Sequence, residues 1–299
     1  MLALAGVVWW ALRQEPPRLP ATREQLAALL LAVALYALAT VVRAERWHAL
    51  LAADGARPPR VDSYALTVVG YAANNVLPAR AGDAVRVMLM APRAGTSRRT
   101  VIGTLLAERL LDVAVVLMLF AIVGYGVLGA IRGASLGLAL GLIAAVAVVA
   151  AGVLALLWRR DRAQAFLAPI LSSTMRLRTR LGALMLLVTI AIWAIEAAVW
   201  MAVGSAVGFG MDPIEGTYLV ALASVFALIP SGPGYAGTQD AAAVIGIKAL
   251  GGSGAVAVAY LVTLRFVIVV PITVAGLALA AARYGGVRRL RAAGREAPA

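Results

Sequence analysis

Long apolar runs separated by short polar stretches dominate the chain. Five of them are long enough to cross a bilayer as helices, because about 20 apolar residues span its hydrocarbon core. These runs are Gln25–Leu51, Val101–Leu128, Leu136–Trp158, Leu181–Phe209 and Ala255–Ala282. The pattern predicts an all-α fold, a polytopic membrane helix bundle.

A further apolar run, Thr217–Leu250, contains residues that a plain membrane helix avoids. Its segment SVFALIPSGPGYAGTQDAAAV holds Pro230, Pro233 and three glycines. Proline removes a backbone donor, and unwound backbone at membrane depth survives only inside protein or beside a wet cavity. We expect a re-entrant hairpin of two half-helices, the second starting near Thr238. Its free N–H groups and positive dipole end would suit an anion such as a lipid phosphate.

A second run, Val61–Met90, has the same anomaly. It reads SYALTVVGYAANNVLPARAGDAVRVMLM from Ser63, so polar residues interrupt an apolar stretch. We expect another re-entrant hairpin, broken near Asn75–Gly82.

The two halves of the chain match in spacing. Arg109 follows Asp83 by 26 positions, and Arg265 follows Asp240 by 25 positions. Each broken run has Pro, then Gly, then an acidic residue, and a span with one buried Arg follows. Inverted repeats with broken helices meeting near the midplane are typical of transporters. We therefore predict an inverted repeat, with halves at about 25–158 and 181–282.

Composition and charge agree with a single integral membrane domain over residues 1–299. The chain is 63% hydrophobic, its mean hydropathy is +0.91 and its net charge is +13. In a membrane protein such charge reflects basic cytoplasmic loops rather than nucleic acid as a partner. The basic linker 159–180 and the basic tail 284–299, which we expect to be disordered, therefore predict a cytoplasmic C-terminus. Three basic residues near the N-terminus, Arg13, Arg18 and Arg23, fall outside in this topology and count against it.

Polar residues of the two broken runs and the neighbouring spans form the candidate substrate-binding site. Arginine can hold a phosphate bidentately, and the acidic groups could neutralise the arginines when no substrate is bound. The alternative is that these charges only pair with one another and fix the helices in register. The candidates are Asn74, Asn75, Arg80, Asp83, Arg86, Glu108, Arg109, Asp112, Glu196, Ser231, Thr238, Gln239, Asp240 and Arg265.

Three residues near the end of the first span share one helix face: Arg43, Arg46 and Trp47. The simplest interpretation is that the arginines snorkel to the membrane surface beside an aromatic belt. The alternative is a contact with a lipid phosphate at that surface.

The sequence contains no recognisable catalytic motif. It has no cysteine and a single histidine, so we expect neither a thiol nucleophile nor a metal site, and we expect no cofactor. A membrane-embedded transferase that uses Asp or Glu as a base stays open.

Several motifs resemble those of the lysylphosphatidylglycerol synthase transmembrane-region family, also called the flippase-domain family. They are NNVLPARAGDAVRVMLM, TLLAERLLDV, ALIPSGPGYAGTQDA and, upstream, RAERWHALL. In two-part members, such a domain is joined to a soluble aminoacyl-transferase domain and moves the aminoacylated lipid across the bilayer. The resemblance covers about Gln25–Ala282 and implies a stand-alone lipid translocator.

The first hypothesis is thus a flippase-like transporter of a phospholipid or other anionic lipid, similar to aminoacyl-phosphatidylglycerol, in the bacterial cytoplasmic membrane. A transferase or accessory subunit acting on polyprenyl-linked sugars is the alternative. A non-transporting scaffold is a third hypothesis, favoured if every buried charge is paired and no cavity exists. The expected partner is the membrane lipid, and the sequence leaves a homodimer open.

Overall fold

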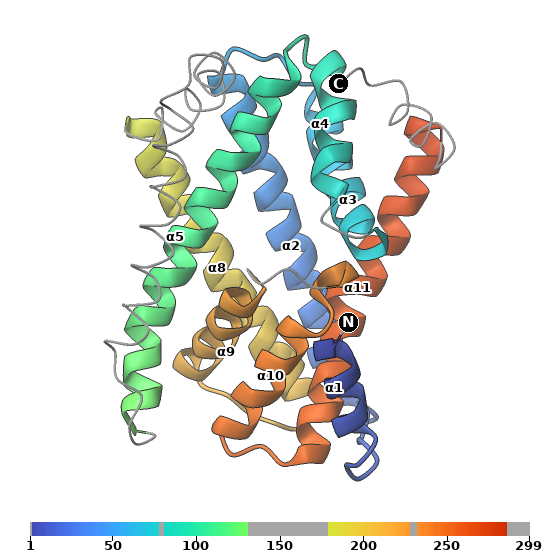
Figure 1. The fold of residues 1–299 in the computed structure, drawn as a ribbon, viewed down its shortest axis with the longest axis vertical. Coiled ribbons are helices and arrows are strands. Elements are labelled where there is room, and N and C mark those ends of the chain that lie inside the picture. The colour runs from blue at the N-terminus through green and yellow to red at the C-terminus, as the bar shows by residue number, and fades with distance from the viewer. Residues whose placement is uncertain (1, 78–80, 131–178, 228–231, 286–299) are drawn as a thin grey trace.

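The chain folds into an elongated bundle of helices in the computed structural model (Figure 1). The structure describes residues 2–77, 81–130, 179–227 and 232–285. The predicted span Leu136–Trp158, nearly all of the basic linker and most of the basic tail lie outside these ranges. Every regular element within them is helical, as the sequence predicts.

The described helices follow the predicted apolar runs closely. Their bounds are α1 Leu2–Ala11, α2 Arg23–Ala53, α3 Arg60–Val76, α4 Ala81–Arg93, α5 Arg98–Ala130, α8 Arg180–Ala206, α9 Pro213–Phe226, the 3-10 turn η2 Pro233–Tyr235, α10 Thr238–Ala249 and α11 Gly254–Tyr284.

Three of the described helices, α2, α8 and α11, are long and apolar enough to cross a membrane. The fourth long helix, α5, has 33 residues and carries Glu108, Arg109 and Asp112 within it. A helix rises about 1.5 Å per residue, so each of the four exceeds the thickness of about 30 Å of the hydrocarbon core. The chain is therefore a multi-pass membrane protein.

Both predicted breaks are present. In the first unit, α3 ends at Val76 and α4 begins at Ala81. In the second unit, α9 ends at Phe226, η2 follows, and α10 begins at Thr238 as expected. Gly234 and Gly237 have φ angles of 61° and 101°, which L side chains rarely adopt, so glycine is required at these two turns. We call α3–α4 and α9–α10 the first and second helix-break units.

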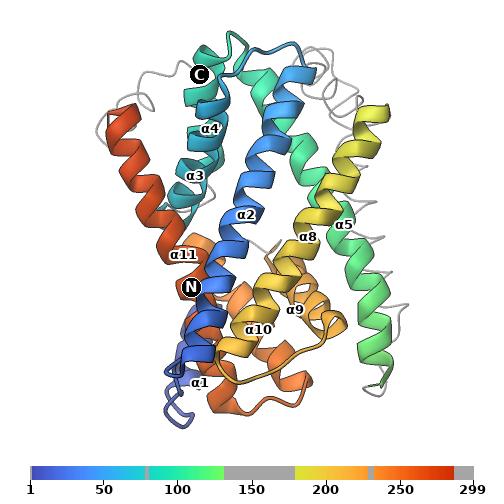
Figure 2. The same cartoon turned by 180° about the vertical axis from the view of Figure 1, so that it is seen from behind.

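The packing is reciprocal between the two halves. The first helices of the halves, α2 and α8, pack along each other, and α2 lies between α8 and α11 in Figure 2. In each half, the long helix that follows the broken unit packs on the broken unit of the other half, because α5 contacts α9 and α11 contacts α3. An inverted repeat would produce such reciprocal contacts. The re-entrant course of the two units and the inverted repeat themselves stay predictions.

Close backbone approaches hold the first unit together. A Cβ added at Gly82 would lie 1.9 Å from the Gly70 carbonyl oxygen, so α4 begins directly against α3. A Cβ at Gly276 would lie 2.7 Å from the Val68 carbonyl oxygen, so α11 also touches the α3 backbone. Such small-residue contacts are typical of membrane helix packing.

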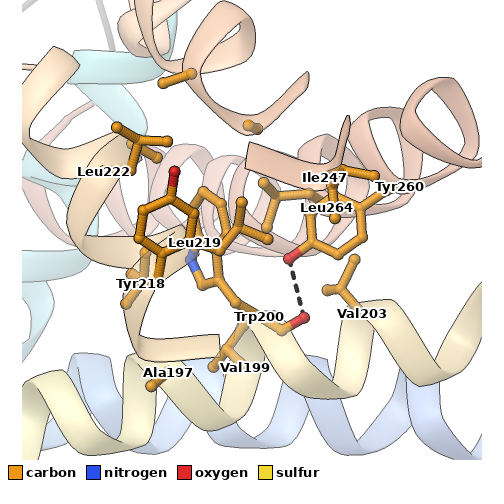
Figure 3. Packing of buried hydrophobic residues seen from close by; sticks show 14 of the residues in the cluster. Ala197, Val199, Trp200, Val203, Tyr218, Leu219, Leu222, Ile247, Tyr260 and Leu264 are labelled. Carbon is orange, nitrogen blue, oxygen red and sulfur yellow. Dashed lines mark hydrogen bonds between the residues drawn. The ribbon is translucent and has the colours of Figure 1, made fainter. Parts of the chain in front are cut away.

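A buried apolar cluster joins the second unit to α8 and α11 (Figure 3). Leu219 of α9, Ile247 of α10 and Leu264 of α11 lie in it. Tyr260 of α11 donates its hydroxyl to the Trp200 carbonyl oxygen of α8, 2.9 Å away. A buried hydroxyl needs such a partner, so this bond fixes α11 against α8.

Candidate functional site

A cavity of about 280 Å³ lies between the two helix-break units. Seven helices and η2 contribute to its wall, so it collects residues from both halves of the chain. The lining residues are Tyr36, Arg43, Tyr71, Asn74, Asn75, Arg109, Asp112, Val113, Val116, Trp193, Glu196, Trp200, Val220, Ser224, Ala227, Gly234, Gln239, Ile268 and Val269.

The charged face of α2 points into the bundle. Arg43, Arg46 and Trp47 are all buried, and Trp47 donates its indole N–H to Thr104 of α5. The predicted snorkelling and the alternative contact at the membrane surface are therefore both wrong. The reason is that this face packs against α5 and α8, whose acidic side chains pair with the arginines and compensate for the loss of water.

Arg43 and Glu196 form an ion pair at the cavity wall. Arg43 Nη1 lies 2.5 Å from Glu196 Oε1, and both side chains are about nine-tenths buried. The guanidinium carbon of Arg43 also lies 6.0 Å from the ring centroid of Trp193. This places a cation, an anion and an aromatic ring on one side of the cavity.

Arg46 joins α2 to α5 and α8. Its two terminal nitrogens bind the two oxygens of Asp112 at 2.8 and 3.0 Å, and Nη1 also donates to Thr189 at 2.7 Å. Its Nη2 lies 3.8 Å from Glu108. Glu108 and Asp112 thus share a helix face, as their spacing predicts.

Arg86 of α4 continues this chain of charges. Its side chain is fully buried, stacks over the Trp47 ring with the guanidinium carbon 4.0 Å from the centroid, and donates to Glu108 at 3.2 Å. The stack combines a cation–π contact with an ion pair, which holds the guanidinium plane fixed.

The break of the first unit is held by Asn74 and Arg109. Asn74 Oδ1 accepts the Gly82 backbone N–H at 2.9 Å, which satisfies a donor at the start of α4. Arg109 of α5 donates to both oxygens of Asp83 at 3.2 and 3.3 Å. Asn75 donates to Thr273 of α11 at 3.0 Å, so the two halves also meet at this break.

The break of the second unit has an equivalent ion pair. Asp240 accepts the Gly237 N–H at 2.8 Å and the Arg265 Nε–H at 2.6 Å. Arg265 also donates to the Gly234 carbonyl oxygen at 2.6 Å. The sequence predicts that the start of α10 is open to an outside anion. The structure places the protein's own carboxylate there, because Asp240 lies at the third helical position and reaches back to the preceding N–H.

The predicted site residues fall into three groups. Six line the cavity: Asn74, Asn75, Arg109, Asp112, Glu196 and Gln239. Six more are not among the lining residues: Asp83, Arg86, Glu108, Thr238, Asp240 and Arg265. Two of these six bind a lining residue, because Asp83 accepts from Arg109 and Arg265 donates to the Gly234 carbonyl oxygen. The remaining two, Arg80 and Ser231, lie outside the described residues.

Sequence reasoning did not place several lining residues in the site. The sequence pattern predicts Arg43 at the membrane surface and gives no signal for the rings of Tyr36, Tyr71 and Trp200, yet all four residues line the cavity. The available signal for Arg43 was an acidic residue in the middle of another span, Glu196, which needs a buried cation.

Within the described ranges, no group of three His, Asp or Glu side chains could hold a metal ion. Most of the charged side chains around the cavity are instead joined to one another, and the cavity remains between them. The scaffold hypothesis required such pairing without a cavity, and the cavity is present.

A bundle of apolar spans with a charged cavity between two broken helices defines a polytopic membrane protein with an internal polar site. The chain belongs to the family described as lysylphosphatidylglycerol synthase TM region, whose model matches residues 1–276. No curated protein and no solved structure matches the chain.

Proposed function

We propose that the protein is a flippase-like transporter that moves a phospholipid or another anionic lipid between the leaflets of the cell membrane. One observation carries the proposal: Asn75 beside the first helix break and Gly234 at the second line one cavity, whose wall also includes Arg43 and Arg109. Membership of a family of membrane domains related to lysylphosphatidylglycerol synthesis supports a role in lipid biology.

The cavity suits a head group better than a whole lipid. Its volume of about 280 Å³ lies at the lower end of the range for small-molecule sites, about 300–1,000 Å³. A phosphate with its polar substituent fits that space, whereas two acyl chains do not. The head group would enter the cavity while the chains remain in the bilayer.

Several polar groups in the wall are available to a head group. Trp193 Nε1 and Gln239 Oε1 are buried and have no hydrogen-bond partner among the described residues. A buried donor or acceptor without a partner carries a desolvation penalty, and a hydrogen bond from a bound ligand can offset that penalty. Arg43 and Arg109 supply guanidinium groups for the phosphate, and each is held by an acidic partner when the site is empty.

The distribution of charge supports a cytoplasmic C-terminus. The start of α3, the end of α4 and the end of α11 lie at one end of the bundle (Figure 1). Exposed arginines gather at this end: Arg57, Arg60, Arg93, Arg98, Arg99, Arg180 and Arg283. The described residues at the opposite end include fewer basic side chains: Arg13, Arg18, Arg23 and Lys248. By the positive-inside rule, the arginine-rich end faces the cytoplasm.

The proposal is tested with purified protein in liposomes that contain head-group-labelled lipids in both leaflets. A membrane-impermeant quencher reaches only the outer leaflet, so translocation appears as signal loss beyond that of empty liposomes. We expect translocation of at least one lipid among phosphatidylglycerol, phosphatidylethanolamine and lysyl-phosphatidylglycerol. No loss beyond empty liposomes for any of them would contradict the proposal, and product formed from a polyprenyl-linked sugar would favour a transferase.

The matched variants are Arg109→Ala and Arg98→Ala. Both remove an arginine from α5, but Arg109 lines the cavity, whereas Arg98 is exposed at the arginine-rich end. We expect Arg109→Ala to abolish translocation and Arg98→Ala to retain it. Equal translocation rates for the two variants would show that Arg109 is not part of the transport site.

A further inference from the structure

The carboxylate of Asp83 lies between two guanidinium groups. Its Oδ1 is 3.2 Å from Arg109 Nη2, which is hydrogen-bond distance, and 3.9 Å from Arg86 Nη1, which is an ion-pair distance without a hydrogen bond. Both Asp83 and Arg109 are partly exposed, with 27% and 30% of their side chains accessible. Asp83 is thus bound to one arginine and adjacent to a second.

Arg86 has donors to spare. Its Nη2 binds Glu108, but Nε and Nη1 are buried and have no hydrogen-bond partner among the described residues. Leaving charged donors unpaired in the interior is costly. Stacking on Trp47 fixes the guanidinium plane, and the unpaired Nη1 is the atom that lies nearest to Asp83.

The second helix-break unit lacks this arrangement. Asp240 receives hydrogen bonds from the Gly237 N–H and from Arg265, and only 6% of its side chain is accessible. Within the described residues, Arg265 is the arginine paired with Asp240. The carboxylate of the second unit is therefore fixed, while that of the first unit has two alternative partners.

We propose that Arg86 is a positioning residue that takes over the Asp83 carboxylate when a lipid phosphate displaces it from Arg109. This inference rests on the proposed function. A lipid phosphate and the Asp83 carboxylate compete for the Arg109 guanidinium. When the phosphate binds, the carboxylate moves a short distance from Arg109 to Arg86 and so remains paired inside the bundle. Arg86 itself does not touch the lipid. Because Asp83 lies in the first turn of α4, the exchange would link head-group binding to movement of the first unit.

Two variants distinguish this positioning role of Arg86 from a purely structural role in stabilising the fold. Glu108→Gln removes the competitor for Arg86, so Asp83 shifts toward Arg86 and Arg109 becomes more available to lipid. The double variant Arg86→Gln with Glu108→Gln leaves Asp83 only Arg109. We expect half-saturating lipid concentrations to fall several-fold in the first and to rise by about tenfold or more in the second.

Binding is measured by titrating the detergent-solubilised full chain with dihexanoyl forms of phosphatidylglycerol, phosphatidylethanolamine and lysyl-phosphatidylglycerol. Tryptophan fluorescence reports occupancy, because Trp193 and Trp200 line the cavity. Melting temperatures check that each variant is folded, and Asp83→Asn, which removes the competing charge altogether, should bind at least as tightly as Glu108→Gln.

Opposite shifts of the half-saturating lipid concentration in the two variants would support the exchange. If Arg86 and Glu108 only stabilised the fold, both variants would shift this concentration in the same direction. Weaker binding in both variants would overturn the exchange and leave the proposed function standing. Wild-type protein that neither binds any of the three lipids nor translocates them would overturn the proposed function, and the exchange with it.

Discussion

Arg43 and Glu196 are 153 residues apart in the sequence and lie 2.5 Å apart in the structure. They join α2 to α8, the first helices of the two halves, and both line the cavity. The pair is therefore both a structural link and part of the wall that a head group would meet.

This pair makes a stability prediction. Removing one partner leaves the other charge buried alone, which costs about 3–5 kcal/mol, whereas replacing both by apolar residues is close to neutral. We expect Arg43→Leu and Glu196→Leu each to lower the melting temperature in detergent and the double variant to recover most of the loss. A double variant whose loss is the sum of the two single losses would show that the residues do not interact.

The close contact between α4 and α3 makes a second prediction. Gly82→Ala places a methyl group 1.9 Å from the Gly70 carbonyl oxygen, so the start of α4 must move. Overpacking of this kind costs about 1–3 kcal/mol. We expect a lower melting temperature and lost translocation in the liposome assay.

The control for this prediction is Gly210→Ala. A Cβ at Gly210 meets no atom within 4 Å, and its φ is not in the left-handed region, so its melting temperature and activity should match wild type. A Gly82→Ala protein with the wild-type melting temperature would contradict the prediction, because it would show that α4 can move away from α3 without a loss of stability.

Much of this architecture was predictable because the breaks carry their own local signals. Proline, glycine and amide residues within apolar runs predicted both breaks and the start of α10 at Thr238. The similar spacing of Asp83 to Arg109 and of Asp240 to Arg265, 26 and 25 positions, singled out these residues as part of a predicted repeat, and the structure joins each of the two as an ion pair.

The position of Arg43 and Arg46 was not predictable from local pattern. Arginine near the end of an apolar run usually snorkels, but α2 continues to Ala53, so both residues lie well inside the helix. Their partners, Glu196 and Asp112, are brought to them only by the packing of distant helices.

The central claim is that lipid head groups pass through the cavity, and a single introduced thiol tests it most directly. The natural chain has no cysteine, so Ser224→Cys, at a cavity-lining position of α9, gives one reactive site of nearly the same size. Ile245→Cys, on α10 at a position that is 53% exposed and outside the cavity lining, is the control.

Both variants are reconstituted in liposomes, treated with a charged thiol reagent, and assayed for translocation as a function of the fraction labelled. We expect labelling at residue 224 to stop translocation, and we expect excess lipid substrate to slow that labelling. Labelling at residue 245 should leave translocation unchanged and should proceed at the same rate with or without excess lipid. Full translocation by completely labelled Ser224→Cys protein would contradict passage of the head group through this cavity.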